Sequence, residues 1–226
     1  MPATAPIEIR ATLTVAGMRE LATFAAGCGW LSPERAERAR REASEMVALS
    51  LATDESSDAL QALVRHLRQT EQLTPALVLR AILSGRLTFV EAALADLAHL
   101  PIQRVGGLVS EAAGPGFSAL YERAGLPREL KPAFVAGLQA VRDAARHPAG
   151  GSERSRRTLE RVMAACGALP RQSSGKLLSF LRRFEAQAAR EEARRIADAL
   201  VDDMAERRLA YRSPEALEDD SFAAAA

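Results

Sequence analysis

The sequence predicts an all-α fold, and three observations lead to this prediction. Hydrophobic residues make up 48% of the 226 residues and aromatic residues only 4%, so the core must be built largely from Leu, Ala, Val and Ile. Leu and Ala favour helices, whereas sheets favour β-branched and aromatic residues. Apolar residues recur at helical spacing between Pro and Gly breaks. The short connections predict antiparallel helical hairpins, arranged as a solenoid or as a bundle.

The first part of the chain contains an expected tail and three expected helices. The tail covers residues 1–11. Ser32-Pro33 combines an N-cap with Pro at the first helical position, and the acidic and serine cluster at 54–57 is typical of another helix start. The expected helices cover 14–26, 33–52 and 58–69.

The middle of the chain has the most regular helix starts and stops. Thr74-Pro75 repeats the pairing of an N-cap with Pro, and Gly85 ends the helix that follows. Thr88 and Glu91 fit a capping box, in which the Thr side chain caps the helix and the Glu side chain bonds back. The expected helices cover 75–84, 89–99, 101–113, 117–124 and 128–146.

The last part of the chain begins with a segment rich in Pro and Gly at 147–152, which is the clearest linker. The linker separates an expected helical-repeat module over 1–147 from a helical C-terminal extension over 152–212, and a disordered tail is expected over 213–226. The extension consists of an Arg-rich helix at 153–166, a loop at 167–175 and a long C-terminal helix at 176–210.

An ordered set of short motifs lies between Leu73 and Pro127. These motifs and their spacing resemble the core of the bacterial family catalogued as domain of unknown function 2336. The resemblance implies an all-helical, HEAT-like module in a bacterial cytoplasmic protein, and it implies no activity. The motifs are Leu-Arg-Ala around Arg80, Gly85 ahead of Phe89, Glu91-Ala92-Ala93-Leu94, Leu97-Ala98 with Pro101, and the closing Leu120-Tyr121 and Ala124-Gly125-Leu126-Pro127.

Two kinds of residue in this segment are expected to be structural. Arg80 and Glu91, which the resemblance picks out, are expected to act in helix pairing and capping and not in catalysis. The apolar positions should be mostly buried against neighbouring helices. These positions are Leu77, Ile82, Phe89, Leu94, Leu97, Leu120 and Tyr121.

The sequence contains no pattern typical of a catalytic site, a metal site or a cofactor site. His66, His99 and His147 lie on three separate segments, whereas a zinc site needs three or four ligands held together. No Ser has a His and an acid as plausible partners. Cys28 is expected to be a small buried side chain at a helix end. We therefore expect no enzyme activity and no cofactor.

The cellular setting follows from what the sequence lacks. Cys28 and Cys166 do not form a C-x-x-C pair, and the first ten residues do not have the pattern of a secretory signal. No run of about 18 apolar residues is present, so no membrane-spanning segment is expected. A cytoplasmic location with reduced thiols is the expectation.

The Arg-rich helix carries one clear basic patch. A solvated helix face would explain it, and so would contact with a phosphate backbone or an acidic partner. The net charge of only +1 argues against nucleic acid as the main partner. Lys176, at the expected start of the long helix, could help to hold an anion. The candidate anion or partner contacts are Arg154, Arg156, Arg157, Arg161 and Lys176.

The long C-terminal helix carries a narrow apolar stripe between blocks of Arg and Glu, which is typical of a helix that packs along one seam. Its distal part, Ile196, Leu200 and Met204, needs another surface, so a homodimer or a partner contact is expected there. The expected function is protein–protein interaction, as an adaptor or regulator in bacterial signalling or cell organisation. The alternatives are nucleic-acid or nucleotide binding through residues 154–161 and an unrecognised enzyme.

Overall fold

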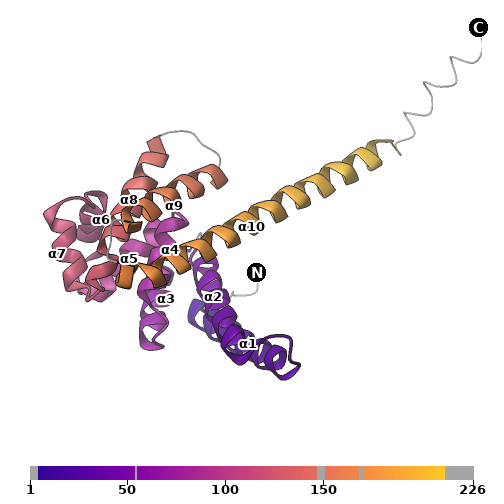
Figure 1. Cartoon of the computed structure of the whole chain (residues 1–226), viewed down its shortest axis with the longest axis horizontal. Helices are drawn as coiled ribbons and strands as arrows, with labels where there is room; N and C mark the ends of the chain where they lie inside the picture. The colour runs from indigo at the N-terminus through magenta and orange to yellow at the C-terminus, as the bar shows by residue number, and fades with distance from the viewer. Residues whose placement is uncertain (1–4, 54, 147–150, 168–170, 212–226) are drawn as a thin grey trace, which may run out of the picture. The chain divides into compact units, whose positions relative to one another are not determined.

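The fold is all-α, as the sequence predicts (Figure 1). The computed structural model describes residues 5–53, 55–146, 151–167 and 171–211, and this part of the chain contains no β-strand. The predicted tail at 213–226 lies outside the described residues. The elements are α1 (Ile7–Gly27), α2 (Pro33–Leu51), α3 (Ser57–Gln69), α4 (Pro75–Leu83), α5 (Leu87–Ala98), α6 (Ile102–Ser110), α7 (Pro115–Arg123), the short 3₁₀ helix η1 (Arg128–Leu130), α8 (Lys131–Arg146), α9 (Gly151–Gly167) and α10 (Arg171–Tyr211).

Several helix boundaries follow directly from local sequence. The Ser32 hydroxyl accepts a hydrogen bond from the backbone N–H of Arg35, and Pro33 occupies the first position of α2. The Thr74 hydroxyl accepts from the backbone N–H of Leu77 at 3.1 Å. Both caps were predicted, and each satisfies one of the N–H groups that a helix leaves unpaired at its start. Gly85, with φ of 70°, follows the end of α4 as predicted.

The predicted starts of α1 and α5 are wrong. Helix α1 begins at Ile7, inside the predicted tail, because Ile7 and Ala11 are buried where α1 contacts neighbouring helices. Helix α5 begins at Leu87, with Arg86 at the N-cap position and no side-chain cap. Thr88 therefore lies inside the helix, and the predicted capping box with Glu91 does not form.

The core is built around α4, which has no exposed face. All seven residues from Leu77 to Leu83 are buried. Helix α4 contacts α5, α8 and α9, while α5 also contacts α3, α6 and α7. Gly137 makes one of these contacts close, since a Cβ there would lie 2.7 Å from the Ile82 Cγ2 atom. These contacts join helices that are not consecutive in the chain, such as α4 with α8 and α5 with α3. This pattern fits a helical bundle, and the HEAT-like repeat stays a prediction.

The predicted core positions are confirmed with one exception. Leu77, Ile82, Phe89, Leu94, Leu120 and Tyr121 are each at most 2% exposed, whereas Leu97 is half-buried. The Tyr121 ring meets the Phe134 ring edge-on at 5.2 Å. The Tyr121 hydroxyl donates a hydrogen bond to the Pro127 carbonyl at 2.7 Å, which satisfies the polar end of this buried side chain.

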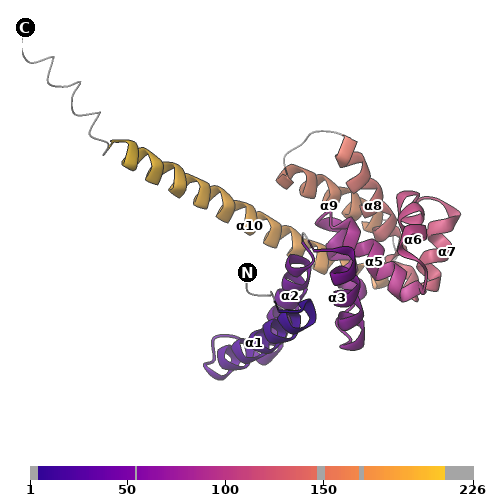
Figure 2. The same cartoon turned by 180° about the vertical axis from the view of Figure 1, so that it is seen from behind.

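Two helical hairpins flank this core. Both views show α1 beside α2 and α8 beside α9 (Figures 1 and 2), and each pair is in extensive contact. Because α9 packs on α8, the first compact unit continues to Ser179 and does not end at residue 147. Residues 147–150 of the predicted linker lie outside the described residues, and its last two residues, 151 and 152, begin α9 instead. That the C-terminal extension folds as a separate domain stays a prediction.

Helix α10 begins at Arg171, five residues before the predicted start. Most of the predicted loop at 167–175 is therefore helical, and Lys176 lies within the helix instead of at its N-terminus. The anion site expected there loses the free backbone N–H groups on which it depended. From Phe180 onward the helix belongs to a second unit, which is described by itself.

Candidate functional site

The described residues contain no group of three or more His, Cys, Asp or Glu side chains that could hold a metal ion. The Nε2 atom of His66 lies 3.3 Å from the Thr12 hydroxyl, and His99 is exposed at the C-cap of α5. His147 lies outside the described residues. Across the same residues, no helix combines the length and the apolar content that a membrane crossing needs.

The Arg-rich helix α9 presents those of its basic side chains that the structure describes to solvent, and acidic side chains lie beside Arg156 and Arg161. Arg156, Arg157 and Arg161 are exposed. Arg156 lies 3.9 Å from the Glu160 carboxylate, and Arg161 forms an ion pair with Asp143 of α8. The side chains of Arg154 and Lys176 lie outside the described residues. The predicted basic patch therefore also contains two carboxylates, those of Glu160 and Asp143, which were not among the predicted contacts.

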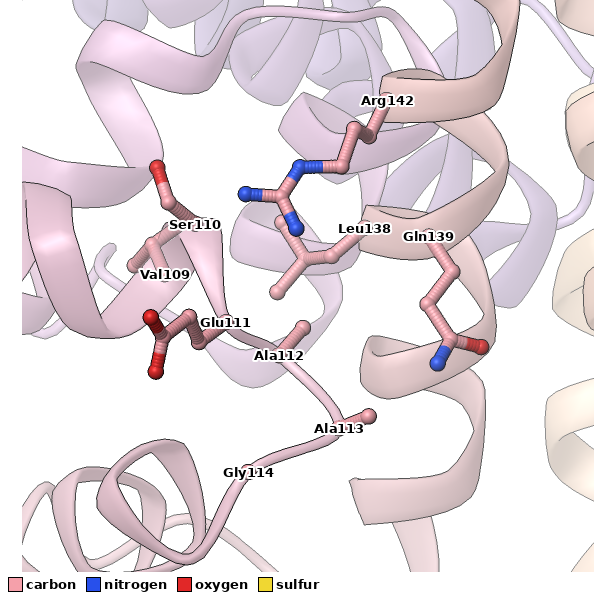
Figure 3. A pocket seen from close by; sticks show the side chains of 9 residues that line it. All are labelled: Val109, Ser110, Glu111, Ala112, Ala113, Gly114, Leu138, Gln139 and Arg142. Carbon is pink, nitrogen blue, oxygen red and sulfur yellow. The ribbon is translucent and has the colours of Figure 1, made fainter.

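A hollow of about 250 Å³ opens between the C-terminal end of α6, the loop that follows it and α8 (Figure 3). Its apolar lining includes Val109, Ala112 and Leu138, and its polar lining includes Gln139 and Arg142. In Figure 3 the Arg142 side chain extends above Leu138 towards the wall of the hollow that residues 109–111 form.

A second hollow of about 600 Å³ adjoins the first and shares Gln139 and Arg142 with it. Asp143 and Arg161 also line this second hollow. We call the two hollows together the Arg142 cleft. The cleft thus joins one of the predicted Arg residues, Arg161, to a residue that the sequence reasoning did not single out, Arg142.

Arg142 is the side chain that defines the chemistry of the cleft. It is exposed, and among the described residues its guanidinium has no hydrogen bond and no ion pair. A guanidinium presents five N–H donors in a planar fork that matches a carboxylate or a phosphate. Glu111 supplies a carboxylate on the opposite side of the first hollow (Figure 3). On the side of Arg142, away from the Glu111 carboxylate, the cleft can therefore hold an acidic group next to a small apolar one.

Arg80 is the best-buried charged residue of the described chain, at 3% exposed. Its Nε donates to the Glu45 carboxylate of α2 at 2.9 Å, so Arg80 links α4 to α2. Burial raises the pKa of Glu45, while Arg80 and a hydrogen bond with Thr74 oppose this rise. The pair is enclosed and lines no hollow of the Arg142 cleft.

Glu91 is half-buried where α5 contacts α6, and burial raises the pKa of its carboxyl group. Its carboxylate lies over Gly106 of α6, since a Cβ at that glycine would be 3.5 Å from the Glu91 Oε2 atom. Glu91 therefore lies against its neighbouring helix instead of bonding back to its own N-terminus.

A third hollow, of about 390 Å³, lies between α3, α5 and the start of α6. Asp96, His99 and Arg65 line it. Asp96 is already paired with Arg68 at 2.6 Å, and the Arg65 guanidinium donates a hydrogen bond to the Gln61 carbonyl of its own helix at 3.4 Å.

A family described as an uncharacterised protein conserved in bacteria (DUF2336) matches residues 5–172. The chain belongs to this family. The match is wider than the resemblance over residues 73–127 that the sequence motifs carried. No curated protein and no solved structure matches the chain.

The DUF2336 match includes the whole Arg142 cleft and α9, and it ends within the first turn of α10. The predicted stripe of Ile196, Leu200 and Met204 lies beyond the match. Each of these side chains is more than half exposed on α10. Their role in a dimer or a partner contact stays a prediction.

Cys28 corrects one further expectation. Its place at a helix end predicts a small buried side chain, but Cys28 is exposed in the structure. It follows the last residue of α1 and lies in a turn that the neighbouring helices do not cover. The Cys166 side chain lies outside the described residues.

Proposed function

We propose that this DUF2336 chain is a protein-interaction module, an adaptor or regulator in bacterial signalling or cell organisation. In this proposal it acts in the cytoplasm and binds an acidic segment of a partner protein in the Arg142 cleft. One observation carries the proposal: the Arg142 guanidinium has no partner among the described residues and stands beside an apolar lining.

The shape of the cleft favours a peptide segment. Two adjoining hollows share Gln139 and Arg142, so a partner segment along α8 would pass both of these side chains. Leu138 and Val109 would contact an apolar side chain of the partner, and Arg142 would bind a neighbouring carboxylate. Arg is enriched among the residues that dominate binding energies at protein interfaces, because it combines charge with a large contact area.

The test is affinity capture from a lysate of a bacterium that encodes this chain, followed by cross-linking to locate the contact. The wild-type chain is compared with Arg142→Glu and with Arg104→Glu as a matched control. Arg104 is also exposed, on α6, but it does not line the cleft. We expect capture by the wild type and the control and a loss of at least tenfold with Arg142→Glu. Equal capture by both variants would contradict the proposal.

The exposure of Arg156 and Arg157 on α9 supports nucleic-acid or nucleotide binding as a second candidate function. Filter binding at two salt concentrations tests it, because contacts to phosphates weaken steeply as salt rises. If nucleic acid binds with a steep salt dependence that a double Arg156→Glu, Arg157→Glu variant abolishes, the second function replaces the first.

A further inference from the structure

Helix α1 carries a stripe of large apolar side chains that the described chain leaves open to solvent. Ile9, Leu13, Leu21 and Phe24 are 50%, 67%, 64% and 59% exposed, and Trp30, just beyond the helix, is 70% exposed. The Phe24 and Trp30 rings meet edge-on with centroids 5.5 Å apart, so the stripe ends in an ordered aromatic pair. Large exposed apolar patches of this kind mark interaction sites.

The stripe is not the face by which α1 joins its own compact unit. That face carries Ile7 and Ala11, which are 5% and 4% exposed, and α1 contacts α2 and α3. With 3.6 residues per turn, Ile9, Leu13 and Phe24 fall on a side of the helix that is turned away from Ile7 and Ala11. Helix α1 is therefore apolar on two faces, and its compact unit covers one of them.

The arrangement of the stripe is symmetric about Gly17 to within one residue. Leu13 lies four residues before Gly17 and Leu21 four residues after it, while Ile9 lies eight before and Phe24 seven after. Two copies of α1 that cross antiparallel at Gly17 would therefore set Leu13 against Leu21 and Ile9 against Phe24. Such an isologous contact, in which the same patch serves both copies, is what a twofold dimer requires.

Gly17 itself supports a crossing at this position. A Cβ at Gly17 would meet no atom of the described chain within 4 Å, so no contact inside the molecule accounts for a glycine there. Glycine in the middle of a helix costs about 0.5–1 kcal/mol relative to alanine. A second helix that approaches closely at Gly17 would account for it, because the missing side chain lets two backbones come together.

We propose that the α1 stripe binds the α1 stripe of a second copy of this chain. In the resulting homodimer the two α1–α2 hairpins form a four-helix bundle across the twofold axis. The charges allow this pairing, because Arg19 lies off the stripe and the Glu20 carboxylate is paired with Arg19 of its own helix at 3.5 Å. This interface differs from the predicted dimer through α10, and it does not depend on the Arg142 cleft.

The area of the stripe sets the expected strength. Five large side chains, each hiding roughly 100 Å² on contact, would remove about 500 Å² per copy and about 1,000 Å² in all. Stable interfaces begin at about 1,000–1,200 Å². The dimer should therefore form in the micromolar range and dissociate on dilution.

Disulfide cross-linking tests the crossing point in the full chain. Residue 17 of one copy faces residue 17 of the other, so Gly17→Cys, in a background with Cys28→Ser and Cys166→Ser, should give a covalent dimer under mild oxidation. Arg19→Cys in the same background is the matched control, because Arg19 is exposed on α1 but lies off the stripe. Equal cross-linking of the two variants would overturn the proposal.

Sedimentation equilibrium tests the interface as a whole. We expect Leu21→Glu to raise the dissociation constant at least tenfold, whereas a substitution at the similarly exposed Leu200 of α10, Leu200→Glu, should leave it unchanged. A wild-type chain that stays monomeric at about 100 µM would overturn the proposal. So would a dimer that Leu200→Glu separates and Leu21→Glu does not, because the α10 stripe would then be the seam. Circular dichroism checks that each variant stays folded.

Discussion

Replacing Arg80 with Met should destabilise the fold by about 3 kcal/mol at pH 8. The substitution leaves the Glu45 carboxylate without its partner, in a site where the Glu45 side chain is only 16% exposed. Removing one member of a buried ion pair costs about 3–5 kcal/mol, since the other charge remains buried. We expect the lower end of this range, because the Thr74 hydroxyl still contacts Glu45.

The pH dependence provides a second measurement on the same variant. The pKa of Glu45 is raised above 4.5 by burial in the folded protein. A carboxyl group with a raised folded pKa weakens folding above that pKa, and the loss disappears as the pH falls through the folded pKa towards 4.5. Removal of Arg80 raises this pKa further. The deficit of Arg80→Met relative to the wild type should therefore be smaller at pH 5 than at pH 8.

Urea unfolding of the wild type, Arg80→Met and the double variant Arg80→Met, Glu45→Leu at both pH values is the assay. The double variant should recover much of the lost stability, because an apolar pair replaces the unpaired charge. Arg41→Met is the control on α2, since the Arg41–Glu37 pair is exposed, and it should leave the unfolding midpoint unchanged. If the deficit of Arg80→Met is the same at both pH values, the role assigned to Glu45 is wrong.

Three further predictions concern the core and the α5–α6 contact. Leu94→Ala should lower the free energy of unfolding by about 2–5 kcal/mol, because Leu94 is fully buried; a loss below about 1 kcal/mol in a urea melt would contradict its place in the core. Tyr121→Phe should cost about 1–2 kcal/mol by leaving the Pro127 carbonyl without its donor. Burial also raises the pKa of Tyr121, so an ultraviolet titration of the folded wild type should show one tyrosine that stays protonated above pH 10. Glu91→Gln should raise the free energy of unfolding at pH 8, where the desolvated Glu91 is charged. This gain in stability should vanish as the pH falls through the raised pKa of Glu91 towards 4.5. A gain that is constant with pH would rule out desolvation as its cause.

The sequence predicts those parts of the fold that depend on a few neighbouring residues. The caps at Ser32 and Thr74 and the stop at Gly85 need only local hydrogen bonds and backbone freedom, and all three are confirmed. The start of α1 at Ile7 could not be predicted this way, because it depends on burial against helices distant in sequence. The same holds for Arg80, whose partner lies 35 residues earlier on α2.

Of the residues that line the Arg142 cleft, the sequence predicts only Arg161, and it does not predict Arg142. The sequence marks Arg161 through the run of Arg residues on α9, but Arg142 stands alone in an ordinary amphipathic helix. Its importance depends on the loop after α6 folding beside α8, and no local pattern shows that contact. A cluster of charged residues can be recognised in a sequence. A single unpaired charge beside an apolar lining, such as Arg142, can be recognised only in the tertiary structure.

The complete burial of α4 has a consequence for how the chain acquires its structure. A helix of nine residues is too short to be stable alone in water. Because seven successive residues of α4 are buried, the helix has no polar face that could remain in contact with water before its neighbours pack against it. Helix α4 therefore becomes stable only when α5 and α8, which follow it in the chain, have closed around it. A growing chain released from the ribosome before residue 146 would expose this hydrophobic segment to solvent. Folding should therefore be all-or-none and should follow synthesis of the complete bundle.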